Sequence, residues 1–191
     1  MENKQNIAEI LCVGTELLLG DIVNTNAAFL SRELAALGFA VYHHSVVGDN
    51  PARLRDALSL ALSRSDLVVM SGGLGPTKDD LTKETVASYF GLELEMREDC
   101  LEEIRSYFAR TGRVMSENNA KQAMIPHGAG VLTNRYGTAP AIAIREQRKT
   151  VIMLPGPPVE LIPIFHEEVI PYLRERGGET IFSRNVNIFG M

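Results

Sequence analysis

Apolar residues along the first part of the chain follow two different spacings. Apolar runs occupy 7–13 and 67–70, which is the pattern of strands buried on both faces of a parallel sheet, and 40–47 is expected to form the strand between them in sequence. Between these runs, leucines recur every three or four residues, first over 27–37 and then after Asn50-Pro51, where the proline suits a helix start. Strand and helix therefore alternate, which predicts a parallel sheet with helices packed on both of its faces.

The second half of the chain predicts more helix and then a change of pattern. Helical spacing continues in three further segments, 81–90, 99–110 and 117–124. The short apolar runs Gly128–Leu132 and Ala139–Ile144 are separated by turn-forming residues, which predicts an antiparallel pair at the edge of the sheet. A last buried strand is expected at 150–154, before a helical stretch that Pro163 and Pro171 should interrupt.

Length and composition fit one domain over 1–176, with 177–191 as the start of a linker or of a following domain. The chain has 191 residues, of which 45% are hydrophobic and 23% charged, as in ordinary globular proteins. In the last segment, Val186 and Ile188 alternate with asparagines, which predicts a half-buried strand. An unpaired strand edge tends to recruit a partner, so this segment should pair with the body of the domain, pack on a second copy or lack order. We favour a second copy, and hence a homo-oligomer, because Phe189 and Met191 would otherwise face water.

Charge and cysteine content disfavour several classes of protein. A net charge of −5 offers no attraction to nucleic acid or to an anionic membrane. Cys12 and Cys100 stand far apart without a Cys-x-x-Cys motif, which predicts buried, reduced thiols and a cytoplasmic location. The chain starts without a secretory signal pattern, and no apolar run approaches membrane-spanning length. We therefore expect neither a nucleic acid nor a membrane as the partner.

The turn after the third predicted strand carries the strongest chemical signal. Gly72, Gly73 and Gly75 precede two adjacent carboxylates, Asp79 and Asp80. Glycines let backbone N–H groups approach an anion, and a following helix aims its own unpaired N–H groups at the same place. The carboxylates would repel a phosphate unless a divalent cation lies between them, and hard oxygen ligands suit magnesium. The segment therefore predicts a metal-assisted phosphate site.

Other interpretations of this turn exist. Two common phosphate loops do not match, because Pro76 follows Gly75 where a P-loop has lysine, and Lys78 stands where the dinucleotide fingerprint has its third glycine. The same residues also fit a plain helix start, in which Thr77 caps the helix and Asp80 completes a capping box. The spacing alone leaves the phosphate site and the helix cap open.

Other turns at the same edge of the predicted sheet also carry polar residues. Ligands of parallel sheets bind at the carboxyl ends of the strands, so these turns should share one pocket. Glu16 and Asp21 follow the first strand and suit a metal site together with the two aspartates, although each also fits a solvated turn. The further candidates, each equally compatible with a helix cap or a stiff turn, are Asn24, Thr25, Asn26, Asn134, Thr138, Pro155 and Gly156.

Together these segments resemble the amino-terminal domain of the CinA family (competence/damage-inducible protein A). The segments that match are Gly14–Asp21, Asn24–Asn26, Ser71–Thr82, Asn134–Pro140 and Leu154–Leu161, in order along nearly the whole chain. The resemblance implies the molybdopterin-binding superfamily, with MogA and MoaB as relatives, and hence a three-layer α/β/α sandwich with a mostly parallel sheet. The amidase domain of this family has no counterpart in the sequence, so we expect no amidase activity from it.

The resemblance also implies two functions for one pocket. CinA-type domains are associated with hydrolysis of ADP-ribose to AMP and ribose 5-phosphate, which makes a metal-dependent nucleotide pyrophosphatase the main prediction. In MogA-like relatives the pocket holds molybdopterin, so the alternative is a molybdopterin or nucleotide binding domain without hydrolase activity. Asp80 and Thr82 match the superfamily pattern Gly-Gly-x-Gly-x-x-x-x-Asp-x-Thr.

The predicted site assigns roles to these residues. Asp79 and Asp80 are expected to act in catalysis and, with Glu16 and Asp21, to hold a divalent metal, with magnesium preferred. Lys78 would offset phosphate charge, although it also fits a solvated turn lysine. The expected substrate-binding residues are Gly72, Gly73, Gly75, Thr77, Lys78, Thr82, Asn24, Asn26, Asn134, Thr138, Pro155 and Gly156.

Overall fold

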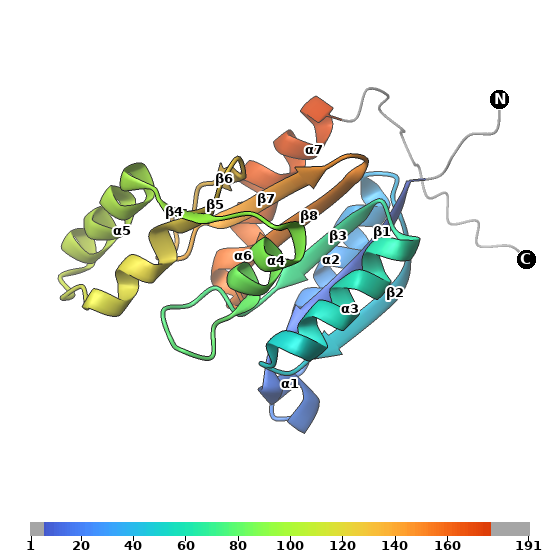
Figure 1. The fold of residues 1–191 in the computed structure, drawn as a ribbon, viewed down its shortest axis with the longest axis horizontal. Coiled ribbons are helices and arrows are strands. Elements are labelled where there is room, and N and C mark those ends of the chain that lie inside the picture. The colour runs from blue at the N-terminus through green and yellow to red at the C-terminus, as the bar shows by residue number, and fades with distance from the viewer. Residues whose placement is uncertain (1–5, 177–191) are drawn as a thin grey trace, which may run out of the picture.

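A sheet of six strands forms the frame of the molecule. The computed structural model describes residues 6–176 (Figure 1). The strands are β1 Ile7–Val13, β2 Ala40–Val47, β3 Leu67–Ser71, β6 Gly130–Leu132, β7 Ala141–Glu146 and β8 Lys149–Leu154. Their order is β2-β1-β3-β8-β7-β6, in which the first four run parallel and β7 is antiparallel to both of its neighbours.

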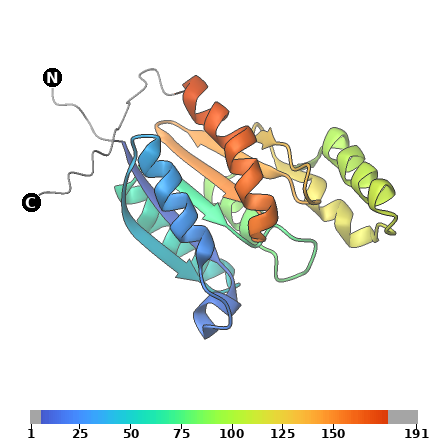
Figure 2. The ribbon, with the colours of Figure 1, turned by 180° about the vertical axis from the view of Figure 1, so that it is seen from behind.

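Helices cover both faces of this sheet, as the apolar spacing predicts. Those outside the arm described below are α1 Thr15–Leu19, α2 Thr25–Ala36, α3 Pro51–Arg64, α4 Thr82–Phe90, α6 Pro158–Ile164, η2 Phe165–Val169 and α7 Ile170–Arg176. α3 and α4 pack on one face, whereas α2 and the consecutive α6, η2 and α7 pack on the other (Figure 1 and Figure 2). The three-layer α/β/α architecture with a mostly parallel sheet is thereby confirmed.

Strand residues alternate between two hydrophobic cores. Leu11 and Met70 face the core under α3 and α4, whereas Ile10 and Val69 face the core under α2 and α6. All four side chains are fully buried. Successive strand side chains point to opposite faces, and both faces are covered here. This is why the central strands appear in the sequence as continuous apolar runs.

The antiparallel edge of the sheet is confirmed, with a different connection from the one expected. Gly130 pairs with Ala143 and Leu132 with Ala141. The chain between β6 and β7 is a loop that reaches the pocket described below, so it is longer than a tight hairpin turn. The tight turn lies instead between β7 and β8, where Gln147 adopts a φ of 54°. This turn contains neither glycine nor asparagine, so no local pattern predicts it.

A small sheet and two helices form an arm at one end of the molecule. Its elements are β4 Leu94–Met96, α5 Glu98–Thr111, the 3-10 helix η1 Glu117–Ala123 and β5 Met124–Pro126. β4 and β5 pair antiparallel, and α5 with the yellow η1 projects away from β2 and α3 (Figure 1). α5 was predicted, whereas β4, β5 and α1 are too short for their spacing to show. The helix predicted at 117–124 is a 3-10 helix.

The prolines near the end of the described chain interrupt helix geometry as predicted. Pro163 lies inside α6, and a π-helical stretch separates α6 from α7, whose second residue is Pro171. Proline lacks an N–H and clashes with the preceding turn, so irregular hydrogen bonding is expected here.

Two further expectations concern membrane-spanning segments and the strand predicted near the end of the chain. Among residues 6–176, no helix combines the length and the apolar content needed to cross a membrane. The predicted strand near 185–189 and its contact with a second copy lie outside the described residues and stay predictions.

Candidate functional site

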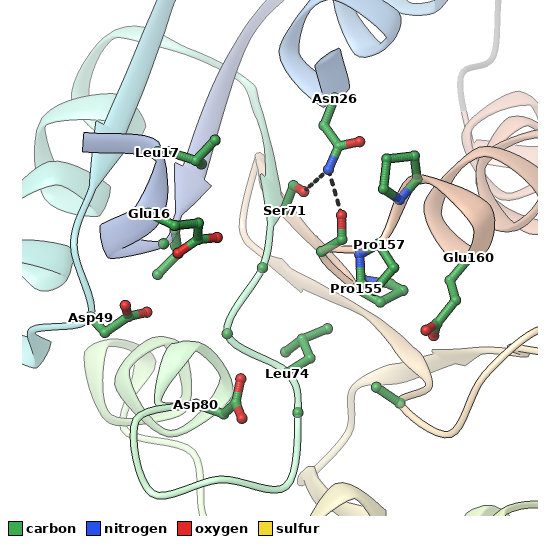
Figure 3. A pocket seen from close by; sticks show the side chains of 18 of the residues that line it. Glu16, Leu17, Asn26, Asp49, Ser71, Leu74, Asp80, Pro155, Pro157 and Glu160 are labelled. Carbon is green, nitrogen blue, oxygen red and sulfur yellow. Dashed lines mark hydrogen bonds between the residues drawn. The ribbon is translucent and has the colours of Figure 1, made fainter. Parts of the chain in front are cut away.

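A cavity of about 570 Å³ opens at the carboxyl ends of β1, β3 and β8 (Figure 3). This is the edge of the sheet where ligands of parallel α/β folds bind. Its walls come from segments far apart in the chain, namely Val13, Gly14, Glu16, Leu17, 22–26, Asp49, 71–77, Asp79, Asp80, Gln122, Thr138, Ala139, 155–158 and Glu160. The turns after β1, β3 and β8 therefore lie around one cavity, as the sequence predicts.

The glycine turn after β3 forms one wall of the cavity. Gly72 and Gly73 have φ values of 103° and 69°, which favour glycine, and a Cβ on Gly72 would overlap the Val13 carbonyl. Thr82 fixes the turn, because its Oγ1 donates to the Gly72 carbonyl at 2.9 Å and its N–H to the Gly73 carbonyl at 3.1 Å. Within residues 6–176, the N–H groups of Gly73 and Gly75 donate to no acceptor. They remain available to an anion in the cavity.

Asp80 organises the loop that follows this turn. Its Oδ2 accepts hydrogen bonds from the Thr77 N–H at 2.9 Å and from Thr77 Oγ1 at 2.6 Å. The helix begins later, at Thr82, with Leu81 at the N-cap position. The capping-box interpretation of Thr77 and Asp80 is therefore wrong, because these two residues lie before the helix and their hydrogen bonds close a loop.

Two lysines behind the loop hold its backbone. Lys121 Nζ donates to the carbonyls of Thr77 at 3.1 Å and of Asp80 at 2.6 Å. Lys83 Nζ donates in turn to the Lys121 carbonyl at 2.7 Å. Lys83 is only 5% exposed, and this burial lowers its pKa to about 8. Neither lysine was predicted, since the contacts join η1 to a loop about forty positions earlier in the chain.

Carboxylates dominate the remaining polar wall. Those that line the cavity are Glu16, Asp49, Asp79, Asp80 and Glu160. In the described part of the chain, no lysine, arginine or histidine lines it. Lys78 is exposed and lies outside the wall, so its expected role in offsetting phosphate charge has no support from its position.

The four predicted metal ligands do not form one cluster. Glu16, Asp79 and Asp80 line the cavity, whereas Asp21 lies outside its wall. In the described ranges, no three His, Cys, Asp or Glu side chains are grouped closely enough to share a metal ion. Magnesium usually takes one or two carboxylates and completes its shell with phosphate oxygens and water. The residues present therefore fit a cation that arrives with a phosphate ligand, rather than one held by the protein alone.

Asn24 and Asn26 enter the cavity from the start of α2. Asn24 caps this helix, with its Oδ1 accepting from the Ala27 N–H at 3.0 Å. Asn26 Nδ2 donates to Ser71 Oγ at 2.8 Å and to the Gly156 carbonyl at 2.7 Å (Figure 3). Asn26 Oδ1 is buried and has no hydrogen-bond partner within the described chain. A buried acceptor without a donor costs free energy unless a ligand or water supplies one.

Glu160 and Asn134 form the opposite wall. Asn134 is buried, and its Nδ2 donates to Glu160 Oε2 at 2.7 Å and to the Ala139 carbonyl at 2.8 Å. Asn134 is absent from the cavity wall, so it positions Glu160 rather than a ligand. Burial raises the pKa of Glu160, although the hydrogen bond from Asn134 opposes that rise.

The structure thus brings together most of the predicted residues and adds others. The expected residues that line the cavity are Glu16, Asn24, Thr25, Asn26, Gly72, Gly73, Gly75, Thr77, Asp79, Asp80, Thr138, Pro155 and Gly156. Asp21, Lys78, Thr82 and Asn134 lie outside the wall. Sequence reasoning missed Asp49 and Glu160. Asp49 follows β2, so the rule that searches the turn after each parallel strand would have found it, whereas Glu160 inside a helix gives no such signal.

A three-layer α/β/α domain with a polar pocket at the carboxyl ends of its parallel strands defines a class of small-ligand-binding α/β proteins. A family model described as "Probable molybdopterin binding domain" matches residues 9–175, and the chain belongs to this family. The crystal structure of the protein CinA from Thermoplasma acidophilum resembles this structure with a TM-score of 0.77, and the two sequences are 39% identical. The match covers 84% of this chain and 94% of that chain. The chain is therefore a CinA-type member of the family.

Further relatives extend this picture. A competence-damage inducible protein of Acetivibrio thermocellus is 53% identical over 184 residues, which are 96% of this chain and 45% of the relative. The chain thus spans less than half the length of the curated relatives it matches. MoaB of Thermus thermophilus, described as a molybdopterin biosynthesis enzyme, is 21% identical with a TM-score of 0.59, over 90% of this chain and 93% of that one. At this identity the likeness concerns the fold alone.

Proposed function

We propose that the cavity binds a phosphorylated pterin or nucleotide together with a divalent cation. One observation carries this proposal. The wall combines unpaired N–H groups of the glycine turn with five carboxylates, and no positively charged side chain of the described residues lines it. The N–H groups favour an anion, and the carboxylates favour a cation, so the ligand must bring both.

The size of the charge repulsion, compared with that of the hydrogen bonds, supports a cation bound together with the phosphate. A phosphate charge about 4 Å from one carboxylate is repelled by roughly 4 kcal/mol at an effective dielectric constant of about 20. Each N–H group of the turn returns only about 1 to 3 kcal/mol. Several carboxylates therefore outweigh the two donors of Gly73 and Gly75 unless a cation reverses the sign of the interaction. Asp79 and Asp80 are the carboxylates adjacent to the turn, and they would hold this cation.

The names of relatives favour a pterin. The family description refers to molybdopterin binding, and the structurally similar MoaB is described as a molybdopterin biosynthesis enzyme. Molybdopterin carries a phosphate on a pterin ring system, which matches a cavity with one anion-binding wall and one hydrogen-bonding wall. A nucleotide offers the same two chemistries.

Hydrolysis of a phosphoanhydride, as in ADP-ribose, is the second candidate function. The observation that favours it is the open carboxylate of Asp79, which lines the cavity beside the turn and has no hydrogen-bond partner within residues 6–176. Such a carboxylate can accept a proton from an attacking water, while the turn N–H groups orient the phosphate. A bound magnesium ion would lower the pKa of water and stabilise charge on the phosphate oxygens.

Calorimetric titration with and without magnesium tests the proposal. ADP-ribose and 6-hydroxymethylpterin diphosphate are the probes, and we expect at least one to bind in magnesium and to lose its affinity in excess EDTA. Asp79→Asn should weaken that binding, whereas Asp56→Asn, on the exposed surface of α3, should leave it unchanged.

The outcomes separate the two functions. Appearance of AMP from ADP-ribose in the same samples assigns hydrolysis, and recovery of intact ADP-ribose assigns binding alone. Full affinity in EDTA would overturn the role of the cation. Failure of both probes to bind in magnesium would overturn the proposed function itself.

A further inference from the structure

Two hydrogen-bond acceptors of the cavity wall lie apart from the glycine turn and are not used fully by the protein. One is Asn26 Oδ1, which is buried without a partner in the described chain. The other is the carboxylate of Glu160, for which the structure gives one donor, Asn134. Both are anchored to the segment after β8, because Asn26 contacts the Gly156 carbonyl and Glu160 lies in α6. Figure 3 shows them on the opposite side of the cavity from Asp49 and Asp80.

Glu160 has capacity for more donors than the protein supplies. An ionised carboxylate offers about four lone-pair positions on two oxygens. Asn134 contacts Oε2 only, and the amide of Asn134 is fully used by Glu160, the Ala139 carbonyl and the Tyr136 N–H. Oε1 therefore remains without a donor from residues 6–176 in a wall that is partly shielded from water.

The fold accepts a cost to keep this carboxylate in place. Burial raises the pKa of Glu160, which means that the charged form is less stable here than in water. The chain also uses glycine at position 137, where a Cβ would overlap the carboxylate of Glu160. A glutamate that only tied the loop of Asn134 to α6 could be replaced by a neutral acceptor without this cost.

We propose that Glu160, supported by Asn26, binds hydrogen-bond donors at the end of the ligand that carries no phosphate. The inference rests on the proposed function and gives the ligand its chemical class: a phosphate ester whose other end presents N–H or O–H groups. Ribose hydroxyls and the ring N–H and amino groups of a pterin or purine are the sources that supply this chemistry. A carboxylate opposite the phosphate wall prefers donors and rejects a second anion, so it also sets the direction of the ligand in the cavity.

Glu160→Gln is the informative variant, because the new amide keeps an oxygen for Asn134 and places N–H groups where the ligand needs an acceptor. In magnesium, the dissociation constants of ADP-ribose and of 6-hydroxymethylpterin diphosphate should rise about 10- to 100-fold, the range for hydrogen bonds to a charged group. Inorganic pyrophosphate, which has no such donors, should bind wild type and variant equally within about twofold.

The comparison of ADP with 2′,3′-dideoxy-ADP separates the sources of the donor. If Glu160 binds the ribose diol, the dideoxy compound should bind wild type more weakly than ADP, and the variant should no longer distinguish the two. If it binds ring N–H groups, both compounds should lose the same factor in the variant. Unchanged affinity for all probes in Glu160→Gln, or an equal loss for pyrophosphate and ADP-ribose, would overturn the inference. Failure of every probe to bind the wild type would overturn the proposed function instead.

A stability measurement distinguishes ligand binding from a structural tether. The pKa of Glu160 is raised above its usual value of 4.5, so the folded state holds a proton more tightly than the unfolded state. The free energy of unfolding should therefore fall as pH rises from 4.5 through the raised pKa of the folded state. Glu160→Gln removes this loss, so the ligand-free variant should be at least as stable as wild type at pH 7 by urea unfolding. A clearly less stable variant would make Glu160 a tether and overturn the inference.

Discussion

Asp80 connects the loop geometry to the charge of the pocket. Its carboxylate accepts two hydrogen bonds from Thr77 and lies so close to Gly75 that a Cβ there would overlap it. The same side chain lines the cavity beside the turn N–H groups. The residue therefore shapes the loop and contributes negative charge where the proposed cation would bind.

Asp80→Asn separates these two contributions. An asparagine oxygen can still accept from Thr77, so the melting temperature should change little, but the charge is lost. Binding of the magnesium–phosphate ligand, or its cleavage, should fall at least ~100-fold, the scale for loss of one preorganised electrostatic contact. Calorimetry and AMP release measure this, with Thr77→Val as the control that loosens the loop and keeps the charge. An unchanged affinity and rate in Asp80→Asn would remove the carboxylate from the site.

Single residues show how far sequence reasoning reaches at the site. Gly72 and Gly73 were found because their turn follows a strand, and both are required by positive φ values. Glu160 was missed because its partner Asn134 lies 26 positions earlier and nothing local marks the contact. Thr82 was expected to touch the ligand, whereas it is fully buried and bonds the turn. Local patterns identify which backbone needs glycine, but only tertiary structure shows which side chains reach the cavity.

At the scale of elements, the loop between β3 and α4 depends on η1. The ammonium of Lys121 donates to two carbonyls of the loop, and the buried Lys83 holds the carbonyl of Lys121. The loop that carries the aspartates is therefore held by η1 of the arm in addition to the hydrogen bonds between Thr77 and Asp80 within the loop.

Lys121→Met tests this brace. Loss of the two hydrogen bonds should make the amides of residues 75–81 exchange with solvent about tenfold faster, as expected from the loss of roughly 1 to 2 kcal/mol of local hydrogen bonding. Ligand affinity should fall as well, while the exchange of β1 and β3 amides stays the same. Hydrogen exchange by mass spectrometry measures both regions, and Arg148→Met in the exposed β7–β8 turn is the matched control. Equal exchange of the loop in wild type and Lys121→Met would show that the loop holds itself.

The predictability of elements follows their length and their burial. α2 and α3 were found because each presents a leucine stripe to the sheet, at Leu30 and Leu34 and at Leu54 and Leu58. β4 and β5, with three residues each, are too short to show a period. Their pairing depends on the long excursion through α5, which no local signal encodes.

For the whole molecule, one ion pair links three elements at the sheet end opposite the cavity. Glu9 of β1 is 1% exposed and accepts two hydrogen bonds from Arg64 of α3 and one from Ser45 of β2. Burial raises the pKa of Glu9, but the hydrogen bonds from Arg64 and Ser45 outweigh it, and the pKa is held below its usual value.

Glu9→Gln should therefore destabilise the fold and leave the pocket unchanged. At pH 7 the free energy of unfolding should fall by about 2 kcal/mol, the scale of buried hydrogen bonds to a charged group. Because the folded pKa is lowered, the stabilisation is complete above pH 4.5 and is lost as pH falls through the folded value, so the two proteins should converge in acid. Urea unfolding across pH measures this, with ligand affinity as the control. A constant difference down to acid pH would contradict the ionic origin.

The cavity wall draws on residues from Val13 to Glu160, and Gly72 is hydrogen-bonded to Leu154. During synthesis, the glycine turn leaves the ribosome long before the wall that completes it, so a nascent chain carries this turn without a pocket. We expect ligand recognition to appear late, once β8 has inserted between β3 and β7. The ligand would then select finished molecules over partly folded ones, which makes it a potential pharmacological chaperone for slow-folding variants of this chain.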